Sequence, residues 1–250
     1  MTCLPALEMQ DLDFTYPDGT AAIGELNLRI GRGERLALIG PNGAGKSTLI
    51  ALACGLLSPR SGVVRIFGEP MSARNRAVLR RRIGLVSQNP DDQLFLTSVY
   101  DDVAFGPLNQ KLPREEVDAR VRESLDAVDA GGLANRFSGH LSFGQKRSVA
   151  IACVLAMRPD FLILDEPASN LDPHGRRVLI GQIQALARAS HDEARTLLLV
   201  THDLEMALEC CARAALLSNG KIVAEGPCAQ IMGDRALMEA HRLEVPRSLL

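Results

Sequence analysis

Residues 40–48, Gly40-Pro41-Asn42-Gly43-Ala44-Gly45-Lys46-Ser47-Thr48, decide the fold of this chain. They form the pattern G-x-x-x-x-G-K-S, between one apolar run at 36–39 and another that begins at 49. The first run predicts a buried strand and the second predicts a helix. The glycines let successive N–H groups point into one concavity, and the helix N-terminus adds its positive end. The stretch therefore predicts a phosphate-binding loop for a nucleoside triphosphate in an α/β domain.

Two side chains of the loop have specific expected roles. Lys46 should reach the β- and γ-phosphates, and the Ser47 hydroxyl should be a ligand of Mg²⁺. The alternative is a glycine turn with a chance lysine, which the strand and helix on either side disfavour. We expect ATP contacts from the whole loop, that is from Gly40, Pro41, Asn42, Gly43, Ala44, Gly45, Lys46, Ser47 and Thr48.

A second buried strand, predicted at 161–164, ends in two carboxylates, Asp165 and Glu166. Open α/β sheets bind their ligands at this C-terminal edge. Asp165 is expected to hold Mg²⁺, directly or through water, and Glu166 to accept a proton from the water that attacks the γ-phosphate. Two acidic residues can also simply begin a surface loop. The presence of a phosphate loop in the same chain favours roles in Mg²⁺ binding and proton transfer for these two residues.

Composition sets the outer limits of these predictions. The 250 residues suffice for one large α/β domain, or for one domain with an inserted subdomain. A formal net charge of -2 gives no reason to expect a nucleic-acid partner. The six cysteines show neither C-x-x-C nor metal spacing, and no signal peptide is visible, so a reducing cytoplasm is expected. No apolar run approaches the roughly 18 residues of a membrane span, so a membrane process would need another chain.

The rest of the chain alternates between strand and helix patterns. The remaining predicted elements are an alternating strand at 7–16 that ends in a turn at 16–19 and opens an antiparallel sheet, strands at 63–66 and 83–86, a helical stretch at 89–157 with its clearest helix at 113–128, and a strand at 196–200.

The stretch Leu141-Ser142-Phe143-Gly144-Gln145-Lys146-Arg147 resembles the signature motif L-S-G-G-Q of ATP-binding-cassette (ABC) ATPases. The other motifs of that family follow in order, at Tyr16, Gln88, 169–172 and 201–203. The resemblance covers roughly residues 7–226. It implies an α/β fold with a parallel sheet core around the phosphate loop, an N-terminal antiparallel β subdomain and an inserted helical subdomain at about 89–157. Residues 227–250 are expected to form a short C-terminal helical extension.

The resemblance also implies roles for three residues outside the loop. Tyr16 would stack on adenine, Gln88 would reach Mg²⁺ and the reacting phosphate, and His202 would stabilise charge on the transferred phosphoryl group. Each has a simpler interpretation when taken singly, as a turn aromatic, a polar loop residue and a structural histidine. Their order along the chain favours the functional interpretation.

In this family the signature motif contacts the γ-phosphate held by a second subunit. The resemblance therefore implies a head-to-tail dimer in which Ser142, Gly144 and Gln145 contact the partner's nucleotide. Phe143 departs from the pattern, since it replaces the first glycine of the signature. Its ring is expected to point away from the nucleotide. Every catalytic position is filled, so both sites of a homodimer are expected to be competent.

Residues 88–95 and 101–109 look like the ATPase subunits of energy-coupling-factor importers, above all the cobalt and nickel type. His140 and the segment 242–246 also fit that group. The resemblance implies that ATP hydrolysis powers import through a transmembrane coupling subunit and a substrate-capturing membrane subunit. The chain would lie peripherally on the cytoplasmic face of the cell inner membrane. Cobalt is the first choice of substrate, nickel the second, and biotin or another vitamin the third.

Within this resemblance, the region after Gln88 would meet a helix of the transmembrane subunit. Phe95, Leu96 and Val99 are candidates for that helix-in-groove contact. Each could instead belong to the core of the helical subdomain.

Two other classes remain open. One is a cassette protein without transport, of the DNA-repair or ribosome-associated kind, which usually carries two cassettes or long coiled-coil insertions. The other is a cassette of a cell-division or lipid-export machine, against which the segment 89–93 argues. A kinase or GTPase would have no role for residues 141–145.

Overall fold

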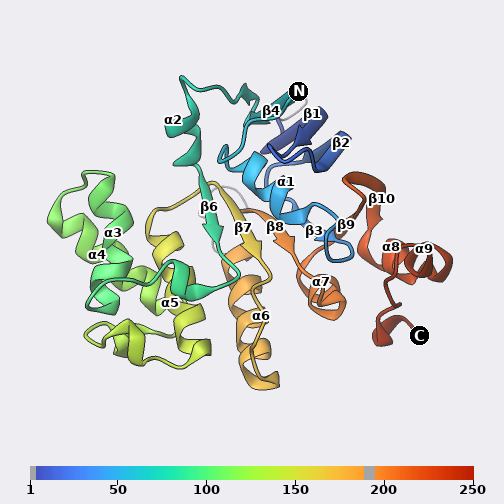
Figure 1. The fold of residues 1–250 in the computed structure, drawn as a ribbon. Helices are drawn as coiled ribbons and strands as arrows, with labels where there is room; N and C mark the ends of the chain where they lie inside the picture. Colours follow the sequence, from blue (N-terminus) through green and yellow to red (C-terminus); the bar gives the residue numbers. More distant parts are fainter. Residues whose placement is uncertain (1–3, 189–194) are drawn as a thin grey trace.

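The computed structural model describes residues 4–188 and 195–250. Its centre is a six-stranded sheet in the order β10-β9-β3-β8-β7-β6 (Figure 1). Strands β9, β3, β8, β7 and β6 run parallel, and β10 pairs antiparallel with β9. The bounds are β3 Arg35–Ile39, β6 Ile83–Val86, β7 Phe161–Asp165, β8 Thr196–Val200, β9 Arg213–Ser218 and β10 Lys221–Pro227. The predicted strands at 36–39, 83–86, 161–164 and 196–200 are therefore confirmed, whereas β9 and β10 had not been predicted.

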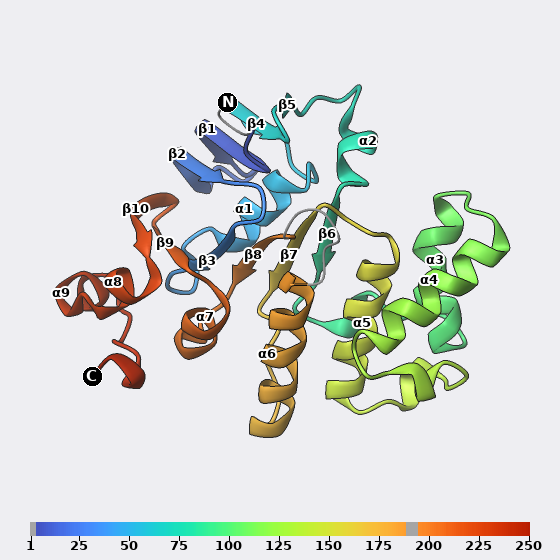
Figure 2. The ribbon, with the colours of Figure 1, turned by 180° about the vertical axis from the view of Figure 1, so that it is seen from behind.

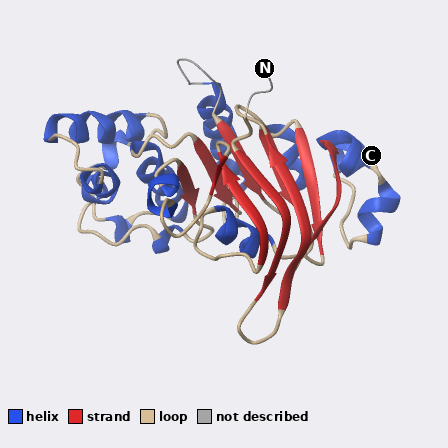
Figure 3. Cartoon of the chain, turned by 90° about the horizontal axis from the view of Figure 1, so that it is seen from above, coloured by secondary structure: helices blue, strands red, loops and turns tan. Residues whose placement is uncertain are grey.

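A second, antiparallel sheet has the order β2-β1-β4-β5. Its strands are β1 Leu7–Thr15, β2 Ala21–Ile30, β4 Ser61–Ile66 and β5 Glu69–Pro70. Strand β1 confirms the predicted opening strand. The predicted turn is confirmed by a hydrogen bond in which the Gly19 N–H donates to the Tyr16 carbonyl at 2.9 Å. Helix α1 (Lys46–Ala53) packs between the two sheets, in one apolar cluster with side chains from both. Figure 3 shows the strands gathered in the middle of the molecule.

The predicted helical stretch after Gln88 is confirmed as a group of short and long helices. They are η1 Pro90–Asp92, α3 Val99–Asn109, α4 Arg114–Asp126, η2 Gly131–Leu133, η3 Ser138–His140 and α5 Phe143–Ala156. Buried valines at helical spacing, Val117 and Val121 among them, join α4 to the same apolar cluster as α3 and α5. Figures 1 and 2 place this group at one end of the molecule.

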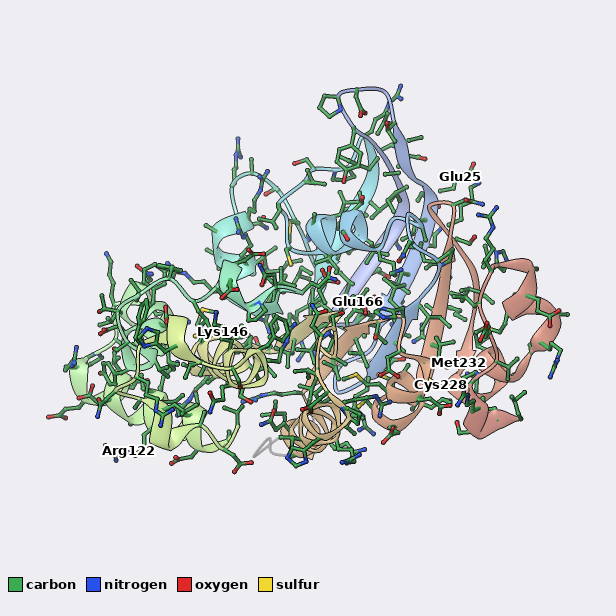
Figure 4. The ribbon with its side chains drawn as sticks, turned by 60° about the horizontal axis from the view of Figure 1, so that its bottom comes forward. Glu25, Arg122, Lys146, Glu166, Cys228 and Met232 are labelled. Atoms are coloured by element: carbon green, nitrogen blue, oxygen red, sulfur yellow. The ribbon has the colours of Figure 1, made fainter. Side chains whose placement is uncertain are left out.

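The opposite end holds the C-terminal extension, here residues 227–250. Helices α8 (Cys228–Gly233) and α9 (Arg235–Ala240) and the turn η4 (Arg247–Leu249) lie beside β10 (Figure 2). Cys228, Met232 and Met238 are buried, so this segment is part of the core; Figure 4 labels the first two. The other helices are α2 Arg76–Arg80, α6 Pro173–Arg188 and α7 Leu204–Cys210. Within the described ranges, no helix is long and apolar enough to cross a membrane.

A buried carboxylate organises the loop in front of α3. Asp102 is only 3% exposed, and one of its oxygens accepts from the N–H groups of Phe95 and Leu96, at 3.0 and 2.9 Å. The other oxygen accepts from the hydroxyl of Ser138, just before the signature segment. Three donors satisfy a charge that would otherwise be costly to bury. Asp102 thereby fixes the exposed loop at Phe95 to the lead-in of α5.

We expect Asp102→Ala to lower the free energy of unfolding by about 3 kcal/mol, because three hydrogen bonds to a buried carboxylate are lost. Urea unfolding followed by circular dichroism measures this change. Asp92→Ala is the matched control, since Asp92 is exposed, and its effect should stay within about 0.5 kcal/mol. Equal effects of the two substitutions would contradict the role given to Asp102.

The turn after β3 requires glycine for steric reasons. Gly40 has φ +155°, and a Cβ built on it would lie 2.1 Å from the carbonyl oxygen of Leu217 in β9. That distance is far inside van der Waals contact, and the neighbour is backbone, so no rotamer change relieves it. The loop that begins at Gly40 is therefore pressed directly against the neighbouring strand.

We expect Gly40→Ala to be one of the rare substitutions that cost more than about 4 kcal/mol, since β3 and β9 must separate to admit the methyl group. Gly181→Ala is the matched control: Gly181 is exposed in α6 with no atom within 4 Å of its built Cβ. It should raise stability by up to about 1 kcal/mol through helix propensity. Thermal unfolding of both variants tests the pair, and a Gly40→Ala protein as stable as the parent would refute the argument.

Candidate functional site

A cavity of about 700 Å³ opens at the C-terminal edge of the parallel strands. It brings together residues that are far apart in the sequence. Its lining consists of Tyr16, Thr20, Ala21, Ala22, all of 40–48, Gln88, Asp165, Glu166, His202, Arg242 and Leu243. Thus every residue predicted to meet the nucleotide of its own subunit lines this one cavity. We call it the loop cavity.

The loop at 40–48 builds one wall of the loop cavity. Gly45 takes the left-handed conformation, with φ +106°, and α1 begins at the next residue. The Lys46 ammonium folds back and donates to the carbonyls of Gly40 and Pro41, at 2.7 and 3.0 Å. Burial lowers the pKa of Lys46, while Glu166 and Asp165 oppose this shift. The lysine therefore sits in the concavity of the loop with carboxylates opposite it.

The two carboxylates at the end of β7 have different surroundings. Burial, and next the charge of Glu166, raise the pKa of Asp165 to about 6, against the opposing charges of Lys46 and Arg147. A half-buried carboxylate beside a second carboxylate fits a divalent cation. Ser47, Gln88 and Asp165 all offer the oxygen donors that Mg²⁺ prefers. Among the described residues, no group of three or more His, Cys, Asp or Glu side chains could hold a metal, so such a site depends on the hydroxyl and amide oxygens.

Glu166 is 8% exposed and lies near the middle of the molecule (Figure 4). One of its oxygens lies 2.7 Å from Nδ1 of His202 and accepts from the His202 N–H at 3.2 Å. The Thr201 hydroxyl donates to the same oxygen at 3.3 Å. Glu166 has φ +45°, a conformation uncommon for a residue with a side chain, and such positions often accompany function. The carboxylate of Glu166 and the imidazole of His202 therefore lie in contact just beyond the ends of β7 and β8.

Tyr16 is held at the other end of the loop cavity. Its hydroxyl lies 2.9 Å from the hydroxyl of Thr48 in α1, and its ring meets Phe14 edge to face at 4.9 Å. The side chain remains 37% exposed. This fixed and partly exposed ring is suited to stacking on a planar base.

Gln88 is positioned by a residue to which the sequence analysis assigned no role. Arg147, in α5, is 1% exposed, and its guanidinium donates to the carbonyls of Ser87 and Gln88 at 2.6 and 2.5 Å. Burial lowers its pKa to about 10. The sequence feature that could have identified Arg147 is its place on the inward side of an apolar helix, where a charged side chain needs a partner. Arg147 joins the backbone at Gln88 directly to the signature helix.

The signature residues lie outside the loop cavity of their own chain. Ser142 caps α5: its hydroxyl accepts from the Gln145 N–H at 3.3 Å, and the Gln145 side chain accepts from the Ser142 N–H at 3.1 Å. Together with Gly144 they line a second cavity, of about 610 Å³, which also includes residues 170–172. A single chain therefore does not unite the signature with the phosphate loop.

Phe143 also lines this second cavity and is half-buried. Its ring centre lies 5.5 Å from the guanidinium carbon of Arg147, within range of a cation–π interaction. The ring that replaces the signature glycine is thus packed along α5.

Sequence reasoning also assigned no nucleotide role to two residues of the C-terminal extension. Arg242 and Leu243 line the loop cavity although they follow the last predicted motif by some forty residues. The likeness of 242–246 to the energy-coupling-factor group marks this segment but not its place at the cavity, because that place depends on how the extension packs.

Known proteins resemble the chain along most of its length. A family model described as "ABC transporter" matches residues 23–169. EcfA of Methanothermobacter thermautotrophicus, an energy-coupling factor transporter ATP-binding protein, is 44% identical over 244 residues, or 97% of this chain and 77% of the relative. The structure of cbiO1 from Clostridium perfringens, part of the ABC transporter complex cbiONQ, is 37% identical with a TM-score of 0.83, covering 98% of this chain and 97% of that one.

A second structure is that of the ATP-binding cassette MJ0796, a dimer in a post-hydrolysis state bound to ADP and Pi. It is 28% identical with a TM-score of 0.78, covering 89% of this chain and 98% of its own. These likenesses confirm the predicted ABC ATPase fold, with its mixed core sheet and antiparallel sheet. The family model spans more than half of the chain, which therefore belongs to the ABC transporter family as a subunit that binds and hydrolyses ATP.

Proposed function

We propose that this chain is the ATPase subunit of an energy-coupling-factor importer of a transition-metal ion, with cobalt as the first substrate to test. The observation that carries the proposal is the segment after Gln88, which resembles this group of importers in sequence and presents exposed aromatic side chains in the fold. The names of two similar proteins, EcfA and cbiO1 of the cbiONQ complex, support a membrane transporter of this kind. The metal itself is a proposal from the sequence resemblance.

In this proposal residues 7–226 form the ABC ATP-binding domain, with residues 89–157 as its helical subdomain and 227–250 as a helical extension. The chain lies on the cytoplasmic face of the inner membrane, held there by its membrane partners. It works as a head-to-tail dimer, as the dimeric cassette MJ0796 suggests. Ser142, Gly144 and Gln145 then contact the nucleotide in the partner's loop cavity. The separation of the signature cavity from the loop cavity supports this arrangement.

The predicted site residues of the loop cavity have distinct roles in the proposed hydrolysis. Tyr16 stacks on adenine, and the N–H groups of residues 40–48 surround the phosphates. Glu166 takes a proton from water as the water oxygen bonds to the γ-phosphorus and the bond to the β–γ bridging oxygen breaks, leaving ADP and phosphate. Lys46 and His202 stabilise the negative charge that shifts during this step.

Ser47, Gln88 and Asp165 would hold Mg²⁺, which would supply further positive charge to the phosphates when bound. The raised pKa of the Asp165 carboxyl, caused by burial and by the charge of Glu166, supports this placement.

The surface for the membrane partner is proposed around the start of α3. Phe95 is 61% exposed, and Phe105 and Leu108 are each 47% exposed. The two phenylalanine rings meet edge to face at 5.3 Å, so they form one apolar ridge. Such a ridge suits a partner helix. Leu96 is half-buried, and for Val99 the alternative interpretation holds, since Val99 is fully buried in the core of the helical group.

We predict that Glu166→Gln keeps ATP binding and loses at least about 99% of turnover, because the amide cannot accept the proton. The variant should also trap the nucleotide-bound dimer. Phosphate release and size-exclusion chromatography with ATP measure the two effects. Lys46→Ala is the contrasting variant and should weaken ATP binding itself. Undiminished hydrolysis by Glu166→Gln would refute the assignment of the base.

We predict that the tagged chain co-purifies from native membranes with a coupling subunit and a metal-capturing subunit, identified by mass spectrometry. The double substitution Phe95→Ser and Phe105→Ser should reduce their recovery at least about tenfold, because the apolar ridge is lost. Val78→Ser is the control: Val78 is 63% exposed on α2, away from the ridge.

Radioactive cobalt and nickel uptake then separate the two metals. Recovery of a vitamin-binding subunit would replace the metal with biotin or another vitamin. Recovery of a division or lipid-export partner would discard import, and recovery of no membrane protein would discard transport.

A further inference from the structure

We propose that the C-terminal extension supplies a nucleotide-binding residue, Arg242, whose guanidinium contacts the phosphate chain of ATP. The inference rests on the proposed position of the nucleotide in the loop cavity. It adds a cation from outside the motifs that run from Tyr16 to His202. Arg242 and its neighbour Leu243 line that cavity.

A hydrogen bond places Arg242 beside the phosphate loop. Nδ1 of His241 lies 3.0 Å from the hydroxyl of Ser218, the last residue of β9. Ser218 follows Leu217, whose carbonyl oxygen is the atom pressed against Gly40. The side-chain hydrogen bond from His241 to Ser218 and the one-residue step from Ser218 to Leu217 therefore connect the segment at Arg242 to the first glycine of the loop.

The extension is anchored on both sides of Arg242. Helix α9 ends with the N–H groups of His241 and Leu243 both donating to the Met238 carbonyl, at 3.1 and 2.8 Å. The Met238 side chain is fully buried. Beyond it, the hydroxyl of Ser248 donates to Glu205 of α7 at 2.6 Å. Arg242 itself has φ +59°, the left-handed conformation that ends many helices and that glycine adopts at least cost. Backbone geometry favours glycine at this position and does not explain the presence of an arginine side chain.

The charges of the loop cavity leave a role for a second cation. Lys46 is engaged with the carbonyls of Gly40 and Pro41, and the opposite wall carries the carboxylates of Asp165 and Glu166. Arg242 is exposed, and its guanidinium makes no hydrogen bond or ion pair with any other described residue. A planar guanidinium can bind two phosphate oxygens at once, so a polyphosphate is the ligand that this chemistry favours.

Equilibrium binding of AMP-PNP, ADP and AMP, with Mg²⁺ present, tests the proposal. Arg242→Ala should lower the affinity for AMP-PNP about tenfold, lower that for ADP less, and leave that for AMP within about twofold. Arg242→Lys should fall between Arg242→Ala and the parent. Arg235→Ala is the matched control, because Arg235 is an exposed arginine at the start of α9 that does not line the cavity. It should bind all three nucleotides as the parent does.

Arg242→Gly separates a ligand contact from a backbone effect. Glycine relieves the left-handed conformation, so this variant should unfold at the same or a higher temperature than the parent while losing as much AMP-PNP affinity as Arg242→Ala. Parent-like AMP-PNP affinity in both variants would overturn the proposal. An equal loss for all three nucleotides would overturn a contact with the β- and γ-phosphates, because it would place Arg242 on the adenosine or on the α-phosphate, which all three nucleotides share.

Lys46→Ala distinguishes failure of this inference from failure of the proposed site. If Lys46→Ala loses AMP-PNP binding while Arg242→Ala keeps it, only the role of Arg242 fails. If Lys46→Ala binds AMP-PNP as the parent does, the nucleotide is not in the loop cavity, and both proposals fail.

Discussion

The phosphate loop depends on close backbone contact between segments that are distant in the sequence. The carbonyl of Leu217 occupies the space where a side chain at position 40 would begin. At the other end of the loop, a Cβ on Gly45 would lie 2.8 Å from the carbonyl oxygen of Ala22, and one on Gly220 would lie 2.6 Å from the same atom. Glycine at these positions lets the loop, β2 and the β9–β10 hairpin pack backbone to backbone. The shape of the loop is therefore set by the two sheets around it.

The same packing explains how three kinds of side chain reach one cavity. Parallel pairing of β7 with β8 places Asp165 opposite Val200, so that Glu166 and His202 extend from adjacent strand ends. Pairing of β3 with β8 and β9 brings the phosphate loop beside them. Burial then acts on the chemistry, since the carboxylate of Asp165 is held where its charge is poorly solvated. A cavity that brings the phosphate loop and two carboxylates together follows from the topology of the sheet.

Two buried charges connect this centre to the helical group. Arg147 holds the backbone at Gln88 from the signature helix, and Asp102 holds the loop at Phe95 from α3. Asp102 also accepts from Ser138, close to the signature. Buried charges are costly unless they are paired or well hydrogen-bonded. Each makes two hydrogen bonds to backbone groups, Arg147 to the carbonyls of Ser87 and Gln88 and Asp102 to the N–H groups of Phe95 and Leu96, so the two loops are fixed relative to the helical group.

The sequence by itself determined the phosphate loop, the acidic strand end and the positions along the chain of the strands at 36–39, 83–86, 161–164 and 196–200. These features rest on local patterns: glycine spacing, apolar runs and the residues that end them. The tertiary structure decided which side chains around them are exposed. Val99 and Phe95 lie four residues apart with similar apolar character, yet one is fully buried and the other is 61% exposed, because Val99 begins α3 against the core whereas Phe95 lies in the loop before that helix. It also decided that Arg147 reaches Gln88 and that Arg242 reaches the loop cavity. These contacts join residues about sixty to two hundred positions apart, and no local pattern encodes a distance of that kind.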